Sequence, residues 1–158
     1  MRRADREVAD FNEILDILRR ADTLRLGVNG GDYPYVVPLS FGFEAVDGAI
    51  VLYFHGAGAG RKHELLRRDP RVCVEADILH KYEETPGSYT ARYESFIGVG
   101  AARRVTGELA AHGMDLLMEH CGFAGREYSR AELEQTAIYR IVLDSFTAKR
   151  NITPLTRA

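Results

Sequence analysis

A helical pattern of apolar positions opens the chain. Five apolar residues recur at spacings of three and four, the period of one helix face: Val8, Phe11, Ile14, Leu15 and Leu18. We therefore predict an amphipathic helix over residues 10–20. Asp10, with Glu13 three residues later, is typical of a capping box at the start of such a helix.

Strand patterns follow over most of the remaining chain, because apolar residues alternate with polar or small ones. The alternation predicts strands over residues 24–28, 35–45, 49–55, 72–78, 93–105 and 137–143. Asp47-Gly48, between the second and third of these strands, favours a hairpin turn. Gly98 and Gly100, inside the fifth, indicate a bulge or a close backbone contact.

Two further helices and two irregular segments complete the pattern. We predict helices over residues 61–68 and 107–120, the first of them ended by Asp69-Pro70. Residues 80–90 are polar and contain a Pro-Gly step, so we expect a loop there. Residues 122–129 are also expected to be irregular.

These elements favour a mainly β fold. Most neighbouring strands are joined by hairpins and short loops, whereas a parallel sheet needs a helix between successive strands. We therefore expect an antiparallel β-barrel with flanking helices packed outside it, since closure removes the exposed edges of a strand-rich chain.

Length and composition agree with a globular chain. It has 158 residues, of which 46% are hydrophobic and 28% charged, ordinary values for a protein with a buried core. We predict a single domain over residues 1–151 and a C-terminal tail over residues 152–158. A formal net charge of −2 argues against a protein that coats nucleic acid, which needs a basic surplus.

The sequence also bears on location. The charged N-terminal residues lead into an amphipathic segment, unlike a secretory signal. The longest strictly apolar run, residues 49–54, is far shorter than the ~18 residues of a membrane span. Two cysteines, Cys73 and Cys121, are too few for a disulfide framework. We therefore expect a cytoplasmic protein without membrane or nucleic-acid partners.

Arginine dominates the basic residues. Lysine and arginine together number 21, and only Lys62, Lys81 and Lys149 are lysine. Arginine is the better bidentate partner for phosphate or carboxylate. A compositional bias of the source genome is the simpler explanation of the excess as a whole.

The segment most informative about chemistry is HGAGAGRK, at residues 55–62, between a predicted strand and a predicted helix. Its glycines let backbone amides turn toward a ligand, and the helix start offers free N–H groups. Arg61 and Lys62 add two cations. The segment indicates a phosphate site, although it matches neither the nucleotide-triphosphate loop nor the dinucleotide motif. A flexible surface loop before a solvated helix start is the alternative.

Two neighbouring features bear on the same site. His55 ends a predicted strand beside the two cations; a histidine there is more often structural, but this place favours contact with a phosphate or a substrate. Pro38 cannot donate to a β-ladder, so it belongs at an edge, a bulge or a gap. A break there would expose backbone groups of Val37 and Leu39 to a planar, hydrogen-bonding ring.

Other reactive side chains form no known motif. The five histidines and two cysteines lack the spacings of a zinc site, so we predict no metal site. The adjacent His120-Cys121 is a poor candidate for a nucleophilic pair, and no G-x-S-x-G elbow occurs.

Several segments together resemble a known family. They are DYPYVVPLSF at residues 32–41, LYFHG at 52–56, GRK at 60–62, VCVEAD at 72–77, SFIGVG at 95–100 and TAKR at 147–150. In this order and spacing they resemble the pyridoxamine 5′-phosphate oxidase-like flavoproteins, and among these the nitroimidazole-resistance (Nim-type) branch. The resemblance covers about residues 1–151.

The resemblance implies a split β-barrel that forms a homodimer and binds FMN in a groove between the subunits. It implies that Arg61 and Lys62, after Gly60, hold the FMN phosphate. It also implies that His55 lies beside the flavin and takes part in reduction of the bound substrate. The other positions that it places at the cofactor are Val37, Pro38, Leu39, Ser40, Tyr53, Phe54 and Ser95.

The implied activity is FMN-dependent reduction of small electrophiles such as nitroaromatic or nitroimidazole compounds, with NAD(P)H as a candidate electron donor. The chain ends in ITPLTRA instead of the Arg-Leu-x-Pro substrate segment of pyridoxamine phosphate oxidases proper, which argues against oxidation of pyridoxamine phosphate. Thr147-Ala148-Lys149 replaces the usual Thr-Gly-Lys and leaves the role of Lys149 open. Two alternatives stay open: a flavin-binding carrier or sensor without turnover, and a relative that binds haem or a deazaflavin.

Overall fold

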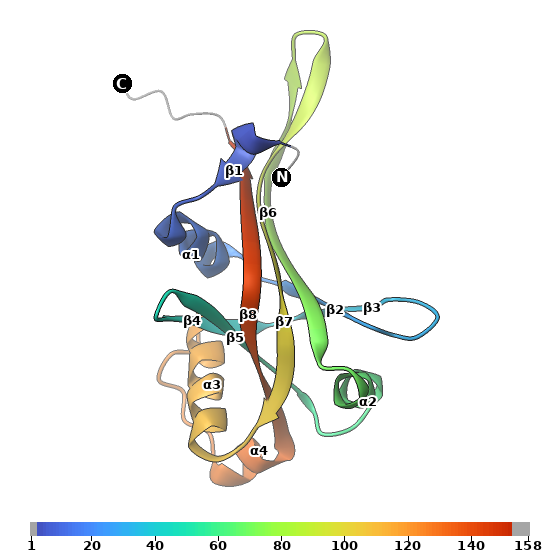
Figure 1. Cartoon of the computed structure of the whole chain (residues 1–158). Coiled ribbons are helices and arrows are strands. Elements are labelled where there is room, and N and C mark those ends of the chain that lie inside the picture. The colour runs from blue at the N-terminus through green and yellow to red at the C-terminus, as the bar shows by residue number, and fades with distance from the viewer. Residues whose placement is uncertain (1–2, 153–158) are drawn as a thin grey trace.

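An eight-stranded antiparallel sheet organises the chain (Figure 1). The structure is a computed structural model that describes residues 3–152. The strands follow the order β3-β2-β6-β7-β8-β5-β4, and β1 pairs with β8. Their bounds are β1 (Glu7–Val8), β2 (Leu24–Val28), β3 (Tyr35–Leu39), β4 (Phe41–Val46), β5 (Ala49–Ala57), β6 (Arg71–Thr85), β7 (Ser88–Val105) and β8 (Thr136–Asn151). The helices are the 3-10 helix η1 (Ala4–Arg6), α1 (Phe11–Arg20), α2 (Arg61–Arg68), α3 (Gly107–His120) and α4 (Arg130–Gln135).

One residue joins the two ends of this sheet. β3 and β4 lie at opposite ends of the strand order, yet only Ser40 separates them in the chain. The sheet therefore curls until its ends meet and forms a split β-barrel with helices outside it. The predicted mainly β fold, a β-barrel with flanking helices, is confirmed.

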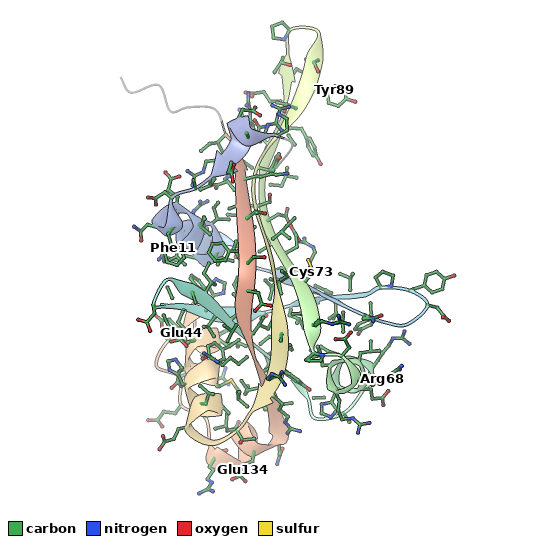
Figure 2. All side chains as sticks on the ribbon, in the orientation of Figure 1. Phe11, Glu44, Arg68, Cys73, Tyr89 and Glu134 are labelled. Carbon is green, nitrogen blue, oxygen red and sulfur yellow. The ribbon has the colours of Figure 1, made fainter. Side chains whose placement is uncertain are left out.

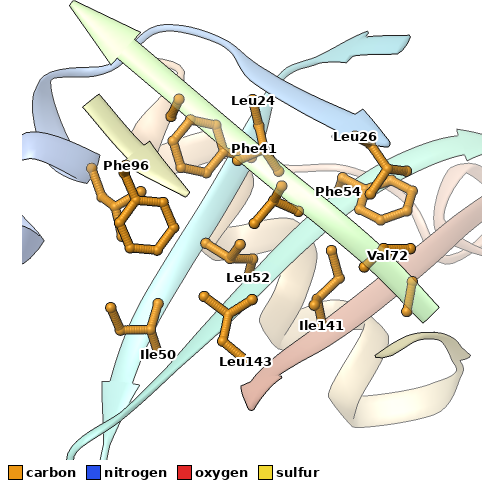
Figure 3. Close-up of a cluster of buried hydrophobic side chains, with 14 of the residues drawn as sticks. Leu24, Leu26, Phe41, Ile50, Leu52, Phe54, Val72, Phe96, Ile141 and Leu143 are labelled. Atoms are coloured by element: carbon orange, nitrogen blue, oxygen red, sulfur yellow. The ribbon is translucent and has the colours of Figure 1, made fainter. Parts of the chain in front are cut away.

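The barrel interior holds the main hydrophobic core (Figure 3). Side chains from six of the strands meet there, among them Leu24, Leu26, Phe41, Ile50, Leu52, Phe54, Val72, Phe96, Ile141 and Leu143. α1 adds Ile14, Ile17 and Leu18 to this core. The predicted start of α1 is confirmed, because the Asp10 carboxylate accepts a hydrogen bond from the Glu13 N–H at 3.0 Å.

α3 packs outside the barrel on β4 and β5 through two glycines. A Cβ on Gly42 would lie 2.4 Å from backbone atoms of Leu116 and Leu117. A Cβ on Gly113 would lie 2.4 Å from the Tyr53 ring. The helix therefore lies close against the sheet and covers a second, smaller hydrophobic cluster.

The predicted hairpin turn and bulge are both present. Asp47 and Gly48 have φ values of 51° and 81°, as the central residues of a type I′ turn require. The pairing of β7 with β8 shifts register between Val99 and Gly100. A Cβ on Gly100 would lie 2.3 Å from the Val142 carbonyl oxygen, so this close approach requires glycine.

Three predicted segments differ from the structure. The strand predicted over residues 137–143 is longer, since β8 runs from Thr136 to Asn151. The expected strand over residues 35–45 is two strands, because the chain leaves β3 at Ser40 and starts a new pairing with β5 at Phe41. The expected loop over residues 80–90 is wrong, since β6 continues to Thr85 and β7 begins at Ser88.

The end of β6 and the start of β7, residues 81–92, pair only with each other and form a hairpin arm that extends beyond the barrel (Figures 1 and 2). Both faces of this arm are largely exposed, as Tyr89 near its tip illustrates with 82% exposure. A strand prediction depends on one buried face, and the arm has none to produce an apolar alternation. α4 was also missed, although Ser129 and Glu132 form the capping box that marks its start.

β8 ends at Asn151, next to the predicted end of the domain. The domain assignment itself stays a prediction, and residues 153–158 of the predicted tail lie outside the described residues. Over residues 3–152, no helix combines the length and the apolar character that crossing a membrane would need.

One buried carboxylate ties the N-terminal helix to the long strands. Glu94 is only 2% exposed. It accepts hydrogen bonds from Arg20 and Arg150 at 2.6 Å each and lies 3.1 Å from His80 Nε2. Burial alone would raise the pKa of Glu94, but the hydrogen bonds from these three partners outweigh it and lower that pKa to about 2.

Replacing Glu94 by Gln should destabilise the fold by about 2–4 kcal/mol, because two guanidinium groups lose their carboxylate. The folded pKa is depressed, so this contribution is complete above the ordinary carboxyl pKa and is lost as pH falls toward the folded value. Urea unfolding at about pH 7 and about pH 3 measures both effects. Glu84→Gln, at an exposed carboxylate, is the control. A Glu94→Gln chain with wild-type stability at neutral pH would contradict the prediction.

Candidate functional site

β3 is an edge strand and carries Pro38. It pairs only with β2, with Pro38 opposite Arg25. The missing N–H of proline is tolerated at an edge, so the predicted place of Pro38 is confirmed. Val37 and Leu39 pack half-buried against the core, whereas the side chains of Pro38 and Ser40 are exposed.

The barrel splits where β3 and β5 separate. Pairing of β4 with β5 stops at Phe41 and Phe54. Beyond this point the chain of β3 turns to pair with β2, and the last three residues of β5, from His55 to Ala57, pair with β8 alone. Both strands therefore keep one edge whose backbone groups no strand takes.

The N-terminus of α2 follows directly on this split. Its N-cap, Gly60, has a φ of 110°, and no side chain caps the helix. The first helical hydrogen bond is donated by the Glu64 N–H to the Gly60 carbonyl at 3.1 Å. The amides of the first three helical residues thus have no acceptor within the helix, which is the arrangement that binds anions.

Arg61 and Lys62 connect this helix start to both separated strands. The Arg61 guanidinium lies 5.5 Å from the centroid of the Tyr35 ring on β3. Lys62 Nζ donates to the His55 carbonyl oxygen on β5 at 3.3 Å and lies 5.2 Å from the centroid of the Phe54 ring. Among residues 3–152, neither cation has a carboxylate within 4.0 Å.

A glycine makes room for this lysine. A Cβ on Gly56 would lie 2.9 Å from Lys62 Nζ. Burial lowers the pKa of Lys62. Burial, and then the positive charge of Lys62, lower the pKa of His55 below its ordinary value of 6.5. His55 is therefore mainly a neutral imidazole at neutral pH.

Together these groups can hold an anion beside an open strand edge. Two cations and three free amides converge at the start of α2, and a phosphate monoester matches both donor types. The unpaired edge of β3 offers backbone donors and acceptors to a flat, polar ring.

The structure brings most of the predicted cofactor positions to the split, and it buries the side chains of two of them. Tyr53 and Phe54 are fully buried. The Tyr53 hydroxyl donates to Glu44 at 2.8 Å, and Phe54 stacks on Tyr139 with ring centroids 4.9 Å apart. β5 is covered on both faces, by α3 and by the barrel interior, so these side chains belong to the core.

Ser95 lies apart from the split within one chain. It sits on the outer face of β7, opposite Asp77 on β6 and Lys149 on β8. Tyr35, the aromatic partner of Arg61, was not among the predicted site residues. The Tyr-Pro-Tyr run before Pro38 is the signal that could have found it, because arginine packs readily on aromatic faces.

Comparison with known proteins shows to which family the chain belongs. The sequence profile of the pyridoxamine 5′-phosphate oxidase family matches residues 10–150. The chain belongs to this family. The resemblance expected from its sequence is confirmed. None of the curated protein sequences compared with this family member matches it.

Solved structures similar to this member of the pyridoxamine 5′-phosphate oxidase family include three of note. A candidate 5-nitroimidazole antibiotic resistance protein from Bacteroides thetaiotaomicron is 30% identical, with a TM-score of 0.81 over 90% of this chain and 85% of that one. A flavocytochrome from Azotobacter vinelandii is 20% identical, with a TM-score of 0.78 over 98% of this chain and 73% of its own. An FAD- and haem-binding protein from Mycobacterium smegmatis is 18% identical, with a TM-score of 0.77 over 92% and 73%. The last two show the fold alone.

Proposed function

We propose that this chain is an FMN-dependent oxidoreductase that reduces small electrophiles, with nitroaromatic compounds such as nitroimidazoles as the substrate class. The observation that carries the proposal is the pair of cations Arg61 and Lys62, to which no described residue offers a carboxylate, at the uncapped start of α2 beside the unpaired edge of β3. The name of the 30% identical relative supports the substrate class. Two structural neighbours are named for flavin binding, which supports a flavin.

The residues present fit the phosphate and the ring of FMN. Arg61 offers a planar fork and Lys62 a point charge, and a phosphate dianion would offset both charges. Gly60 leaves the approach to the free amides without a side chain. Val37, Pro38, Leu39 and Ser40 supply the edge along which the ring would lie.

His55 is placed to act on the substrate. It lies two residues before the end of β5, beside Lys62, and is mainly neutral at neutral pH. Its neutral imidazole N–H can donate a hydrogen bond to a substrate oxygen, and the proton comes from the imidazolium form, for which His55 takes up a proton from solvent. When bound and reduced, FMN supplies a hydride, which with one proton converts a nitro group into a nitroso group and water. NAD(P)H is the proposed source of the electrons.

A homodimer is part of the proposal, supported by an apolar row on the outer face of the sheet. Val36, Cys73 and Val99 lie in register across β3, β2, β6 and β7, with Gly27 between the first two. Val36 and Val99 are 61% and 43% exposed. A row of this kind favours a protein partner. A second copy on this face would bring Ser95 to the partner's cofactor.

The first test concerns the phosphate contacts. The double variant Arg61→Gln/Lys62→Gln should bind FMN at least about a hundredfold more weakly, since each charge-assisted contact contributes about 1.5–3 kcal/mol. FMN fluorescence titration measures this. Arg68→Gln, in the last turn of the same helix, is the control and should bind FMN like the wild type. Unchanged affinity in the double variant would refute the phosphate assignment, and a wild-type chain unable to take up FMN would refute the proposal.

The second test concerns the dimer. Val99→Glu should give a monomer in sedimentation experiments and weaken FMN binding, because a buried carboxylate opposes association and half of the site is lost. Val46→Glu is a matched control, since Val46 on the β4–β5 hairpin has the same 43% exposure. A dimeric Val99→Glu chain with wild-type FMN affinity would contradict a flavin at this interface.

The third test separates a reductase from a flavin carrier. FMN-loaded protein, reduced by NAD(P)H without oxygen, is mixed with a nitroimidazole, and reoxidation is followed by absorbance. We expect faster reoxidation than for free reduced FMN, and a step slowed about tenfold or more by His55→Asn at unchanged FMN affinity. Equal rates for protein and free FMN would instead indicate a carrier.

A further inference from the structure

A second group of arginines, from the last turns of α2 and from β7, has no carboxylate partner among residues 3–152. A cavity of about 420 Å³ separates this helix from β7 and β8. Arg67 lines it from α2, and Arg103 and Arg104 line it from β7. Arg61 and Lys62 do not line this cavity, and His63, whose backbone amide belongs to the free helix start, is the one residue shared by both places.

The arginines of this cavity belong to the half of the sixteen described arginines that has no carboxylate partner. Eight other arginines pair with carboxylates: Arg3, Arg19, Arg20, Arg25, Arg71, Arg92, Arg130 and Arg150. Within the described part of the chain, no carboxylate lies within 4.0 Å of Arg67, Arg103 or Arg104.

The inner wall of the cavity is polar in one place and apolar elsewhere. Tyr139, only 3% exposed, hydrogen-bonds through its hydroxyl to His63 Nδ1 at 2.5 Å. Leu66 and Ala102 are buried apolar residues of the same lining. A ligand complementary to these lining residues has an anionic group and a small apolar or planar body.

The number of donors favours phosphate over carboxylate. Each guanidinium presents five N–H donors in a fixed fork. A phosphate monoester offers three acceptor oxygens and up to two negative charges, so it can engage more than one arginine at once. The volume lies toward the lower end of the range for small-molecule sites.

We propose that this cavity binds a phosphorylated small molecule other than the flavin. Its phosphate is held between Arg67 and Arg104, and its body packs on Leu66 and Ala102. The site does not include Arg61 or Lys62, so this proposal can be tested independently of FMN binding. It also gives part of the arginine excess a specific role.

Phenyl phosphate is a suitable probe, because it combines a phosphate monoester with a small planar body. Calorimetric titration should show that Arg67→Gln/Arg104→Gln weakens its binding at least about tenfold, as loss of charge-assisted hydrogen bonds predicts. Arg68→Gln shares the last turn of α2 but does not line the cavity, so it should bind like the wild type. Inorganic phosphate should bind more weakly than phenyl phosphate, and equal binding would overturn the apolar part of the site.

The flavin site is separated by a further variant. Arg61→Gln/Lys62→Gln should keep its affinity for phenyl phosphate. Loss of binding in that variant, with none in Arg67→Gln/Arg104→Gln, would overturn the proposal and assign the probe to the other end of α2. A wild-type chain that binds no phenyl phosphate would also overturn it. The NMR signals of Ala102 in the wild-type chain should shift on titration, a readout that needs no variant to fold, and unmoved signals would overturn the assignment.

Discussion

The candidate site depends on the point at which β4 stops pairing with β5. If β3, the strand before Ser40, also paired with the last residues of β5, every backbone group of both strands would have a partner and the barrel would close without a split. Instead the chain turns to β2, and two strand edges are left with unused donors and acceptors. Such groups need water or a ligand. Pro38 keeps β3 a poor template for a further strand, because it removes one donor from the ladder.

α2 adds two positive charges to the split in the barrel. Leu65 and Leu66 bury one side of the helix, so its first residues are fixed relative to the barrel. Arg61 then rests on Tyr35 and Lys62 on the His55 carbonyl, which joins the helix to both sides of the split. Neither cation is neutralised by the described residues. A site that is to hold an anion gains from charges that the fold leaves available.

Much of the fold could be predicted from short sequence patterns. The bounds of α2, the cap at Asp10, the turn at Asp47-Gly48 and the bulge at Gly100 each depend on a few neighbouring residues, and the structure has them all. The phosphate motif at residues 60–62 was also local.

Features that depend on distant parts of the chain were harder to predict. The burial of Tyr53 follows from α3, some sixty residues later, which packs over β5. The break at Ser40 follows from a choice between two pairing partners, β2 and β5, that lie on either side of it in the chain. The hairpin arm has no buried face, so its strands leave no periodic trace in the sequence. The role predicted for Ser95 depends on contacts with a second chain. These contacts cannot be seen in the structure of one chain.

The close packing of α3 on the sheet limits how this scaffold can be altered. Side chains larger than glycine at positions 42 and 113 would collide with helix backbone or with Tyr53, and would move β4 and β5, the second of which carries His55. Gly58, by contrast, has open space around its Cβ position. Diversity that tunes ligand size, in nature or in a directed-evolution library, should therefore collect in the loop before α2 while the wall under α3 stays unchanged.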